Sequence, residues 1–282
     1  MAIEFTKMHG LGNDFVMVNE LKGELVTDKA AFARRVCERH FGIGADAAIF
    51  LCSSSKGDAR MRIFNPDGSE AEMCGNGIRC FAFFARKHGI KKEKLSVETL
   101  AGIVTPEIIK RDGKEFVRVS MGAPRFASKE IPVLIQKETC VSEPMKFGPK
   151  SFDVTCVSMG NPHAVIFVDN VDEINLEAYG SKIEKDPLFP KRVNVQFAQL
   201  ITPTRIKMRT WERGAGVTLA CGTGACAVAA AARITNKTRE SKFLVFLPGG
   251  ELELELALEG DAIKNIFLTG PVEEVFEGKL DG

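Results

Sequence analysis

A Cys-Gly-x-Gly unit occurs twice in this chain, and the repeat around it constrains the fold more than any other feature. The first copy lies in MCGNGIRC (73–80) and the second in ACGTGAC (220–226). Cys221 follows Cys74 by 147 positions, and the flanking residues match at this offset or one residue away from it. The matched segments and residues are MRIFNPDGSEAEMCGNG (61–77) with MRTWERGAGVTLACGTG (208–224), GND (12–14) with GNP (160–162), Gly102 with Gly250, and Pro124 with Pro271.

This common register indicates an internal duplication, with two similar domains in one chain. Its period is far too long for a solenoid repeat, and 282 residues suit one or two domains. We expect a first domain at residues 1–125, carrying Cys74, and a second at 126–282, carrying Cys221. The boundary is expected within residues 121–130, and the last strand, at about 263–275, is a candidate to pack on the first domain.

The pattern within each half predicts a mixed α/β (α+β) fold. Strand-like runs at 15–18 and 164–168 precede helix candidates at 28–40 and 175–185, for which Thr27 and Asn175 are the expected N-caps. Each Cys-Gly-x-Gly unit is followed by an apolar helix that lacks a polar face over most of its length, IRCFAFFARKHG or ACAVAAAARITN. We therefore expect two pseudo-symmetric domains, each with β-strands wrapped around one central, buried helix.

Charge and hydropathy exclude several classes of partner. The net charge is +1 and no basic stripe is present, so the sequence predicts neither a nucleic-acid nor a membrane partner. No apolar stretch approaches the length of a membrane span. The N-terminus, MAIEFTKMHGLGND, is typical of folded sequence and not of a signal peptide. A soluble, cytoplasmic protein is the expectation.

The eight cysteines do not suggest a metal site or a disulfide framework. They include no CxxC pair and are accompanied by only four histidines, so we expect no metal and no structural zinc. Most of them should be small buried residues. Cys80 and Cys226 follow the two motif cysteines by six and five positions, spacings that do not share a helix face, and we assign both to the core.

The position of each motif cysteine before a helix suggests acid/base chemistry. A thiol at a helix N-cap meets unpaired N–H groups and the positive end of the helix dipole, so Cys74 and Cys221 should ionise more readily than a free cysteine. The same N–H groups can hold a carboxylate, and glycine permits its close approach. A single such unit would more simply be a tight turn before a helix. Two copies related by pseudo-symmetry could place thiols on opposite sides of one carbon, as inversion of a stereocentre requires.

The motifs GLGNDF, FNPDGSEAEMCGNGIRC, GNPHAVIF and WERGAGVTLACGTGACA resemble those of the diaminopimelate epimerases over nearly the whole chain. The resemblance implies cofactor-independent interconversion of LL- and meso-2,6-diaminopimelate, in lysine and cell-wall precursor synthesis. It also implies an active site in the cleft between two domains, commonly a homodimer, and no pyridoxal phosphate or metal. Two positions depart from family patterns, because Ala47 and Val217 stand where some members carry Gln and Glu.

The resemblance also implies roles for individual residues. Cys74 and Cys221 would be the two acid/base thiols, and Arg213 would hold the distal carboxylate with its bidentate fork. Glu212 would recognise the reacting amino group, and His163 would orient and polarise the thiols. The backbone N–H groups that would hold the reacting carboxylate belong to Gly75, Asn76, Gly222 and Thr223, and the polar substrate contacts to Asn13, Asn65, Asn161 and Asn194.

Structural alternatives exist for these residues. Asparagines in GND, NPD and GNP are usual turn formers, and His163 could be a hydrogen-bonded core histidine. Glu212 and Arg213 could form an ordinary surface pair. The segment GIGAD (42–46) resembles a phosphate loop, but no GK[ST] follows, so we expect a turn.

Two other functions remain open from the sequence. A proline or hydroxyproline racemase would use the same two thiols, but proline has no second carboxylate for Arg213 to bind. A non-catalytic protein could instead use the paired cysteines as a redox switch or metal site. Phenazine-biosynthesis isomerases share the expected fold but lack the cysteine pair.

If the two thiols face each other, oxidation should join Cys74 to Cys221 and reversibly stop catalysis.

Overall fold

The computed structural model describes residues 2–281 of the chain. These residues form two compact units: unit 2 spans Met121–Leu268, and unit 1 contains the described residues up to Ser120 and those from Thr269 onward. No helix among the described residues is long and apolar enough to cross a membrane.

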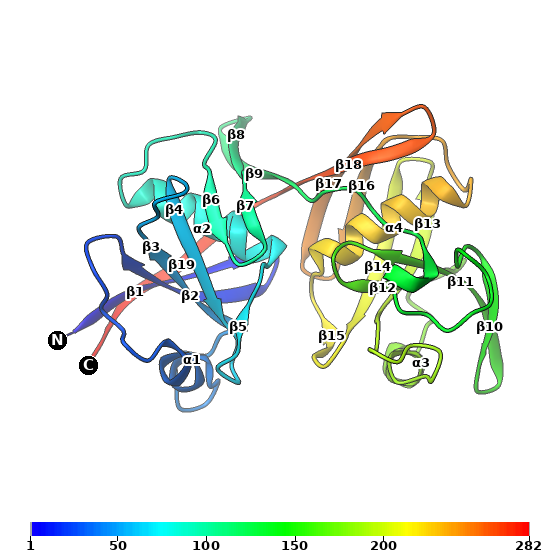
Figure 1. The fold of residues 1–282 in the computed structure, drawn as a ribbon, viewed down its shortest axis with the longest axis horizontal. Helices are drawn as coiled ribbons and strands as arrows, with labels where there is room; N and C mark the ends of the chain where they lie inside the picture. Colours follow the sequence, from blue (N-terminus) through cyan, green and yellow to red (C-terminus); the bar gives the residue numbers. More distant parts are fainter. Residues whose placement is uncertain (1, 282) are drawn as a thin grey trace. The chain divides into compact units, whose positions relative to one another are not determined.

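The sequence-based boundaries differ from this division at two points. Unit 1 ends at Ser120 rather than at residue 125, and the segment after residue 268 belongs to unit 1. The strand that joins unit 1 is β19 (Glu273–Leu280), which pairs antiparallel with β1 (Ile3–Gly10) from Ile3 opposite Leu280 to His9 opposite Glu273. The candidate strand at about 263–275 mostly corresponds to β18 (Ala262–Gly270), most of which belongs to unit 2. The described ends of the chain therefore lie side by side in unit 1 (Figure 1).

The two units share one succession of elements. Unit 1 continues from β1 through β2 (Asn13–Glu20), α1 (Lys29–Cys37), β3 (Ala47–Cys52), β4 (Ala59–Phe64), β5 (Glu70–Ala71), α2 (Gly75–Lys87), β6 (Val97–Thr99), β7 (Gly102–Val104), β8 (Glu107–Arg111) and β9 (Lys114–Ser120). Unit 2 contains η1 (Ser128–Glu130), β10 (Glu143–Phe147), β11 (Lys150–Ser158), β12 (Pro162–Phe167), α3 (Leu176–Glu184), β13 (Asn194–Thr202), β14 (Arg205–Glu212), β15 (Gly216–Thr218), α4 (Gly222–Ile234), β16 (Lys242–Leu247), β17 (Gly250–Glu259) and β18.

Strand pairing follows the same order in both units, as the duplication predicts. From β1 to β7 the successive pairs are antiparallel, parallel, antiparallel, parallel and antiparallel, with β5 as an antiparallel branch on β4. From β11 to β17 the pairs repeat this succession, with β15 as the branch on β14. The predicted mixed fold with two similar domains is confirmed.

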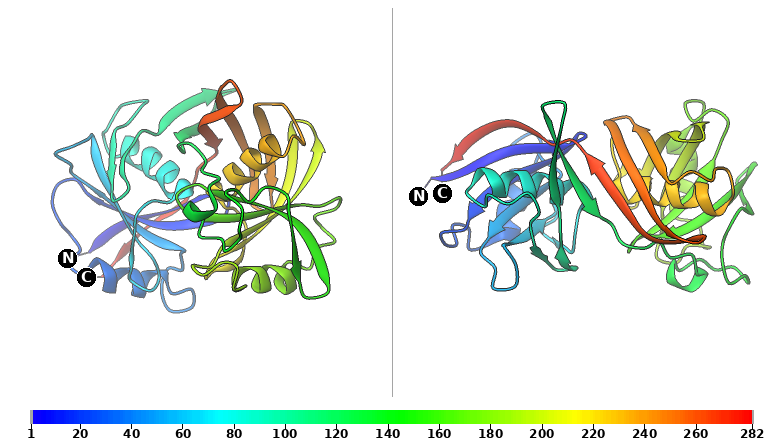
Figure 2. Two further views of the ribbon diagram at one scale, coloured as in Figure 1. Left: turned by 45° about the vertical axis from the view of Figure 1, so that its right-hand side comes forward. Right: turned by 90° about the horizontal axis from the view of Figure 1, so that it is seen from above.

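Each unit encloses one helix. Helix α2 contacts strands β1, β2, β3, β4, β8 and β9, and α4 contacts β11, β12, β13 and β17 (Figures 1 and 2). The residues from Ala225 to Ala232 in α4 are completely buried, and Ile78 to Ala82 of α2 are buried too. The run of alanines makes α4 thin, so strands can approach it closely. The prediction of two buried helices is confirmed, and Cys80 and Cys226 lie in these helices with no exposed surface.

The first turns of the shorter helices correct one prediction. The N-cap of α1 is Asp28, whose side chain accepts from the Ala31 N–H at 2.8 Å, and not Thr27. The N-cap of α3 is Asn175, as predicted. Asp28 and Asn175 are 147 positions apart, the same offset as the two motif cysteines. Aspartate also accepts a capping hydrogen bond at least as well as threonine.

Candidate active site

Cys74 and Cys221 have the same local structure. Cys74 is the N-cap of α2 and its Sγ accepts from the Gly77 N–H at 3.4 Å. Cys221 is the N-cap of α4 and its Sγ accepts from the Gly224 N–H at the same distance. Both N-cap residues have extended backbone angles, and each helix begins with the glycine that follows. The predicted N-cap position of both thiols is confirmed.

The second glycine of each motif packs closely against a strand, more tightly in unit 2 than in unit 1. A Cβ at Gly224 would lie 2.6 Å from Nε2 of Gln196, and one at Gly77 would lie 3.0 Å from Cδ1 of Ile49. The first turn of each helix therefore lies directly on β13 or β3. This contact holds each cysteine at a defined place beside the sheet.

Helix geometry leaves donors next to each thiol. The first N–H groups of an α-helix have no partner within the helix. Within residues 2–281, the backbone N–H groups of Gly75, Gly222 and Thr223 have no acceptor. Such groups at a helix N-terminus form a ready site for an anion. Each unit thus presents a thiol and an anion-binding helix start within one or two residues.

In unit 1, the thiol belongs to a group of polar side chains that we name the Cys74 cluster: Asn13, Asp46, Cys74 and Asn76. Asn13 joins its members, because its Oδ1 accepts from the Cys74 thiol at 3.6 Å and from Nδ2 of Asn76 at 3.0 Å. Its Nδ2 donates to Oδ2 of Asp46 at 2.7 Å. The amide of Asn13 therefore turns its carbonyl toward the thiol and its NH₂ group toward Asp46.

Asp46 is itself held in place by its neighbours. Its other carboxylate oxygen accepts from Arg39 at 2.7 Å, and its backbone N–H donates to the Asp14 side chain at 3.0 Å. Asp14 in turn pairs with the buried Lys7 at 2.7 Å. Lys7 and Arg39 lower the pKa of Asp14 despite its partial burial, which acts in the opposite direction. These contacts hold the Asp46 side chain in place as an acceptor for Asn13.

In unit 2, the corresponding group is the Cys221 cluster: Asn161, His163, Gln196, Thr210, Cys221 and Thr223. Asn161 donates from Nδ2 to Oγ1 of Thr223 at 3.2 Å, and Thr223 Oγ1 lies 3.6 Å from Sγ of Cys221. Oδ1 of Asn161 contacts Nε2 of His163 at 3.0 Å. His163 is therefore linked to Cys221 through Asn161 and Thr223, with no direct hydrogen bond between ring and thiol.

His163 is a buried, neutral histidine. Its Nδ1 contacts Nε2 of Gln196 at 3.2 Å, and Oε1 of Gln196 accepts from Thr210 at 2.7 Å. Burial, with a smaller contribution from Arg213, lowers the pKa of His163 to about 3. The ring is therefore neutral near neutral pH, and it contacts the carbonyl oxygen of Asn161.

The expectation that both thiols ionise easily is wrong for Cys221. Burial raises the pKa of the Cys221 thiol well above its ordinary value, and the Glu212 carboxylate raises it further. Hydrogen bonds from Thr223 and Gly224 oppose this shift without reversing it. Desolvation disfavours the charged form, and at a residue only 4% exposed it outweighs the helix N-terminus. Cys221 accordingly rests as a neutral thiol.

Three predicted residues lie at one end of the β13–β14 pair. Asn194 donates from Nδ2 to the Pro162 carbonyl at 2.9 Å and accepts at Oδ1 from the backbone N–H of Arg213, also at 2.9 Å. The exposed Arg213 side chain donates to the Lys191 carbonyl at 3.0 Å, and no carboxylate among the described residues pairs with it. Glu212 accepts from the Thr218 hydroxyl at 2.6 Å.

None of the hydrogen bonds described above links Asn65 to Cys74. It lies in the turn between β4 and β5, where Nδ2 donates to Oγ of Ser69 at 3.0 Å and the backbone N–H donates to the Ser69 carbonyl at 2.9 Å. These contacts are those of a turn-forming asparagine. Its role as a substrate contact stays a prediction.

Sequence reasoning missed Asp46, Gln196 and Thr210. Asp46 ends the GIGAD segment, which was expected only to turn, and Gln196 and Thr210 stand within strands β13 and β14. Gln196 has no exposed surface and Thr210 has 2%, although both carry hydrogen-bonding groups. A glutamine in the apolar run VNVQFA (193–198) was the one available signal, because a buried amide requires partners.

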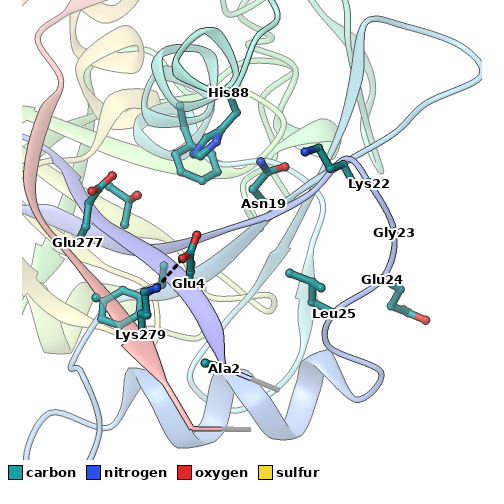
Figure 3. A pocket seen from close by; sticks show the side chains of 14 residues that line it. Ala2, Glu4, Asn19, Lys22, Gly23, Glu24, Leu25, His88, Glu277 and Lys279 are labelled. Carbon is teal, nitrogen blue, oxygen red and sulfur yellow. Dashed lines mark ion pairs between the residues drawn. The ribbon is translucent and has the colours of Figure 1, made fainter.

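A separate pocket of about 780 Å³ lies in unit 1 and contains no predicted site residue. Its walls come from β1, β19, the end of α2 and the segment after β2, and include Asn19, Lys22 and His88 (Figure 3). The ion pair drawn in Figure 3 joins Lys279 to Glu4 at 2.9 Å. Among the described residues, no group of three or more His, Cys, Asp or Glu side chains could hold a metal ion.

The family profile and the similar proteins of known name agree on one family. The profile described as "Diaminopimelate epimerase" matches residues 5–127 and 155–275, one stretch in each half of the chain. A diaminopimelate epimerase of Desulforudis audaxviator is 50% identical over 278 residues, covering 98% of this chain and 99% of that protein. One of Halothermothrix orenii is 49% identical over 286 residues, covering 99% of this chain and 98% of that protein.

Solved structures support the fold at much lower identity. A phenazine biosynthesis protein of the PhzF family from Bacillus anthracis has a TM-score of 0.75 at 20% identity, with all of both chains covered. A hydroxyproline epimerase from Agrobacterium vitis has a TM-score of 0.68 at 16% identity, covering 99% of this chain and 91% of that one. At these identities the likeness concerns the fold alone.

Proposed function

The chain belongs to the diaminopimelate epimerase family of isomerases, and from this premise we propose that it interconverts LL- and meso-2,6-diaminopimelate with two cysteine thiols. The observation that carries the mechanism is the repeated geometry of Cys74 and Cys221. Each caps a helix and lies beside backbone donors that suit a carboxylate. Supply of precursors for lysine and the cell wall is the corresponding pathway role.

In this proposal one thiolate removes the α-proton and the other thiol delivers a proton to the opposite face. Cys221 suits the donor role at the start of a turnover because burial keeps it protonated. Loss of the α-proton leaves negative charge that extends into the α-carboxylate. The N–H groups of Gly75, Asn76, Gly222 and Thr223 are proposed to stabilise that charge, in a site where the exclusion of water strengthens each hydrogen bond.

The distal carboxylate is proposed to bind Arg213. Its guanidinium is exposed and engages only the Lys191 carbonyl among the described residues, so donors remain available for a bidentate contact. Glu212 is proposed to recognise the reacting amino group, and Asn13, Asn65, Asn161 and Asn194 to supply polar contacts. A second carboxylate distinguishes diaminopimelate from proline, which is why we favour it over the racemases of cyclic amino acids.

The test is proton exchange at the α-carbon of LL-diaminopimelate in deuterated water, followed by NMR with reductant and no added cofactor. We expect deuterium at the α-carbon together with meso product, and neither with proline. Absence of exchange with diaminopimelate would contradict the proposed substrate. Exchange with proline alone would favour the racemase alternative. A homodimer and a cytoplasmic location stay predictions from the family resemblance.

A further inference from the structure

A chain of five side-chain hydrogen bonds joins Thr210 to Cys221 within unit 2. It runs from Thr210 to Gln196 (2.7 Å), to His163 (3.2 Å), to Asn161 (3.0 Å), to Thr223 (3.2 Å) and to Cys221 (3.6 Å). Neither Gln196 nor Thr210 is hydrogen-bonded to the Cys221 thiol, although Gln196 packs against Gly224 at the start of α4. The hydrogen-bonded link from these two residues to Cys221 passes through the residues between them.

The direction of every bond follows from the first one. The Thr210 hydroxyl donates to Oε1 of Gln196, so the Gln196 NH₂ group faces His163 and donates to Nδ1. A neutral imidazole that accepts at Nδ1 carries its proton on Nε2, which donates to Oδ1 of Asn161. Asn161 then presents its NH₂ group to Thr223. The Thr223 oxygen accepts this bond, which leaves its own proton to donate to Cys221.

Burial makes this direction difficult to change. Gln196 and His163 have no exposed surface and Thr210 has 2%, so water cannot replace a missing partner. A polar group left unpaired in such an environment is costly, which keeps the chain in its fully bonded arrangement. The Gln196 side chain also packs against Gly224 at the start of α4, so it cannot easily rotate away.

The Thr223 hydroxyl is needed as a hydrogen-bond donor when Cys221 loses its proton. The thiol lies in surroundings that strongly disfavour charge, with the Glu212 carboxylate nearby. A thiolate there is stabilised by the N–H of Gly224 and by a hydroxyl that points its proton toward sulfur. The hydrogen bond from Asn161 to the Thr223 oxygen favours this orientation, because the oxygen then accepts from Asn161 and its own proton is available to sulfur.

We propose that Gln196, held by Thr210, is a positioning residue that sets the Nε2–H tautomer of His163 and thereby aims the Thr223 hydroxyl at Cys221. This inference rests on the proposed function for its kinetic consequence, whereas its tautomer consequence is independent of any substrate. It assigns the buried polar residues Gln196 of β13 and Thr210 of β14 to the second thiol alone.

The experiment compares Thr210→Val, which removes the hydroxyl at nearly constant shape, with Thr210→Ser, which keeps it. Gln196→Met is a second variant that removes the amide. The ¹⁵N resonances of the His163 ring, assigned by their loss in His163→Gln, report the tautomer, and turnover of LL- and meso-diaminopimelate gives kcat and KM. We expect T210V and Q196M to lose the pure Nε2–H tautomer and to lower kcat about 10- to 100-fold, with KM changed less than about threefold. T210S should keep the tautomer and stay within about threefold of wild type.

Three results would overturn the inference: an unchanged tautomer in T210V, a wild-type kcat in both T210V and Q196M, or an equal loss of kcat in T210S and T210V. The proposed function fails separately, if the wild-type protein does not epimerise diaminopimelate. In that case the ring resonances of T210V and T210S still decide whether Thr210 sets the His163 tautomer.

Discussion

The Cys74 and Cys221 clusters differ in how they orient one equivalent amide. Asn13 and Asn161 occupy matched positions of the duplication, and both contact the residue that follows the motif cysteine and its glycine. Asn13 turns its carbonyl toward Cys74 because Asp46 accepts from its NH₂ group. Asn161 turns its NH₂ group toward Thr223 because His163 donates to its carbonyl.

The opposite orientations of the Asn13 and Asn161 amides give the two thiols different surroundings, although the backbone around both thiols is the same. An amide carbonyl beside Cys74 accepts the S–H proton, whereas the amide NH₂ group in unit 2 supports a hydroxyl that can donate to Cys221. The backbone and the N-caps preserve the symmetry of the duplication, and the neighbouring side chains remove it. In the proposed mechanism the two thiols perform opposite proton transfers, and this difference suits each thiol to one of them.

The comparison between the two clusters would fail most clearly if activity did not require both Cys74 and Cys221. We expect Cys74→Ser and Cys221→Ser each to lower epimerisation at least about a thousandfold, because a hydroxyl is a far weaker acid than a thiol and either loss removes one of the two proton transfers. Formation of meso product from LL-diaminopimelate, followed by NMR, measures this. Cys52→Ser, a half-buried cysteine of β3 outside both clusters, is the control and should retain activity. Activity surviving in one motif variant would contradict the equivalence of the clusters.

The amide orientation in unit 1 can be tested through Asp46. Asp46→Asn can offer either oxygen or nitrogen to Asn13, so the Asn13 amide is free to turn its NH₂ group toward Cys74. We expect kcat to fall about 10- to 100-fold. Arg39→Gln removes the exposed cation on the other carboxylate oxygen and leaves the contact with Asn13 intact, so it should stay near wild type. If R39Q lost as much as D46N, charge and not amide orientation would explain the effect.

The buried histidine should make the stability of unit 2 depend on pH. His163 is neutral in the folded chain, with its pKa lowered to about 3, while the unfolded chain takes up a proton below its ordinary value of 6.5. The contribution of His163 to the free energy of unfolding is therefore fully present above pH 6.5. It is lost as the pH falls toward 3. At pH 5 the loss relative to pH 8 is about 2 kcal/mol.

Trp211, the single tryptophan of the chain, lies in β14 and reports unfolding of unit 2. Urea unfolding followed by its fluorescence at pH 8 and pH 5 measures the loss, with His163→Gln as the reference that lacks this titration. The matched position in unit 1 is Phe15, so this contribution belongs to unit 2. An equal pH dependence in H163Q would show that His163 is not its source.

The two motif glycines should differ in the cost of an added methyl group. In Gly224→Ala the new Cβ meets the side chain of Gln196 at 2.6–2.8 Å, and that side chain is held by Thr210 and His163. We expect a loss of about 1–2 kcal/mol in the free energy of unfolding. In Gly77→Ala the nearest atom is the flexible end of Ile49 at 3.0 Å. The better helix propensity of alanine should offset this contact to within about 1 kcal/mol. Equal losses measured by urea unfolding would show that Gln196 can move aside.

Much of the fold could be predicted from the chain because the signals are local or repeated. The common offset gave two similar units, and the apolar runs after each motif gave the buried helices α2 and α4. The capping positions of Cys74 and Cys221 followed from the glycine after each cysteine. The position of β19 could not be obtained in this way, because pairing with β1 joins residues more than 250 positions apart and no local pattern encodes that choice.

The candidate site likewise has features that the sequence predicts and features that only the folded structure determines. The amino-acid order predicts which groups carry chemistry: two thiols before helices, N–H groups beside them, and a guanidinium near the second motif. Their protonation and orientation depend on folding, because desolvation and hydrogen-bond partners come from distant strands. Burial reverses the expected ionisation of Cys221. Asp46 and Gln196, neither marked by a motif, orient the groups beside the two thiols. Electric and hydrogen-bonding environments are properties of packed atoms in space, and they exist only once these strands have come together.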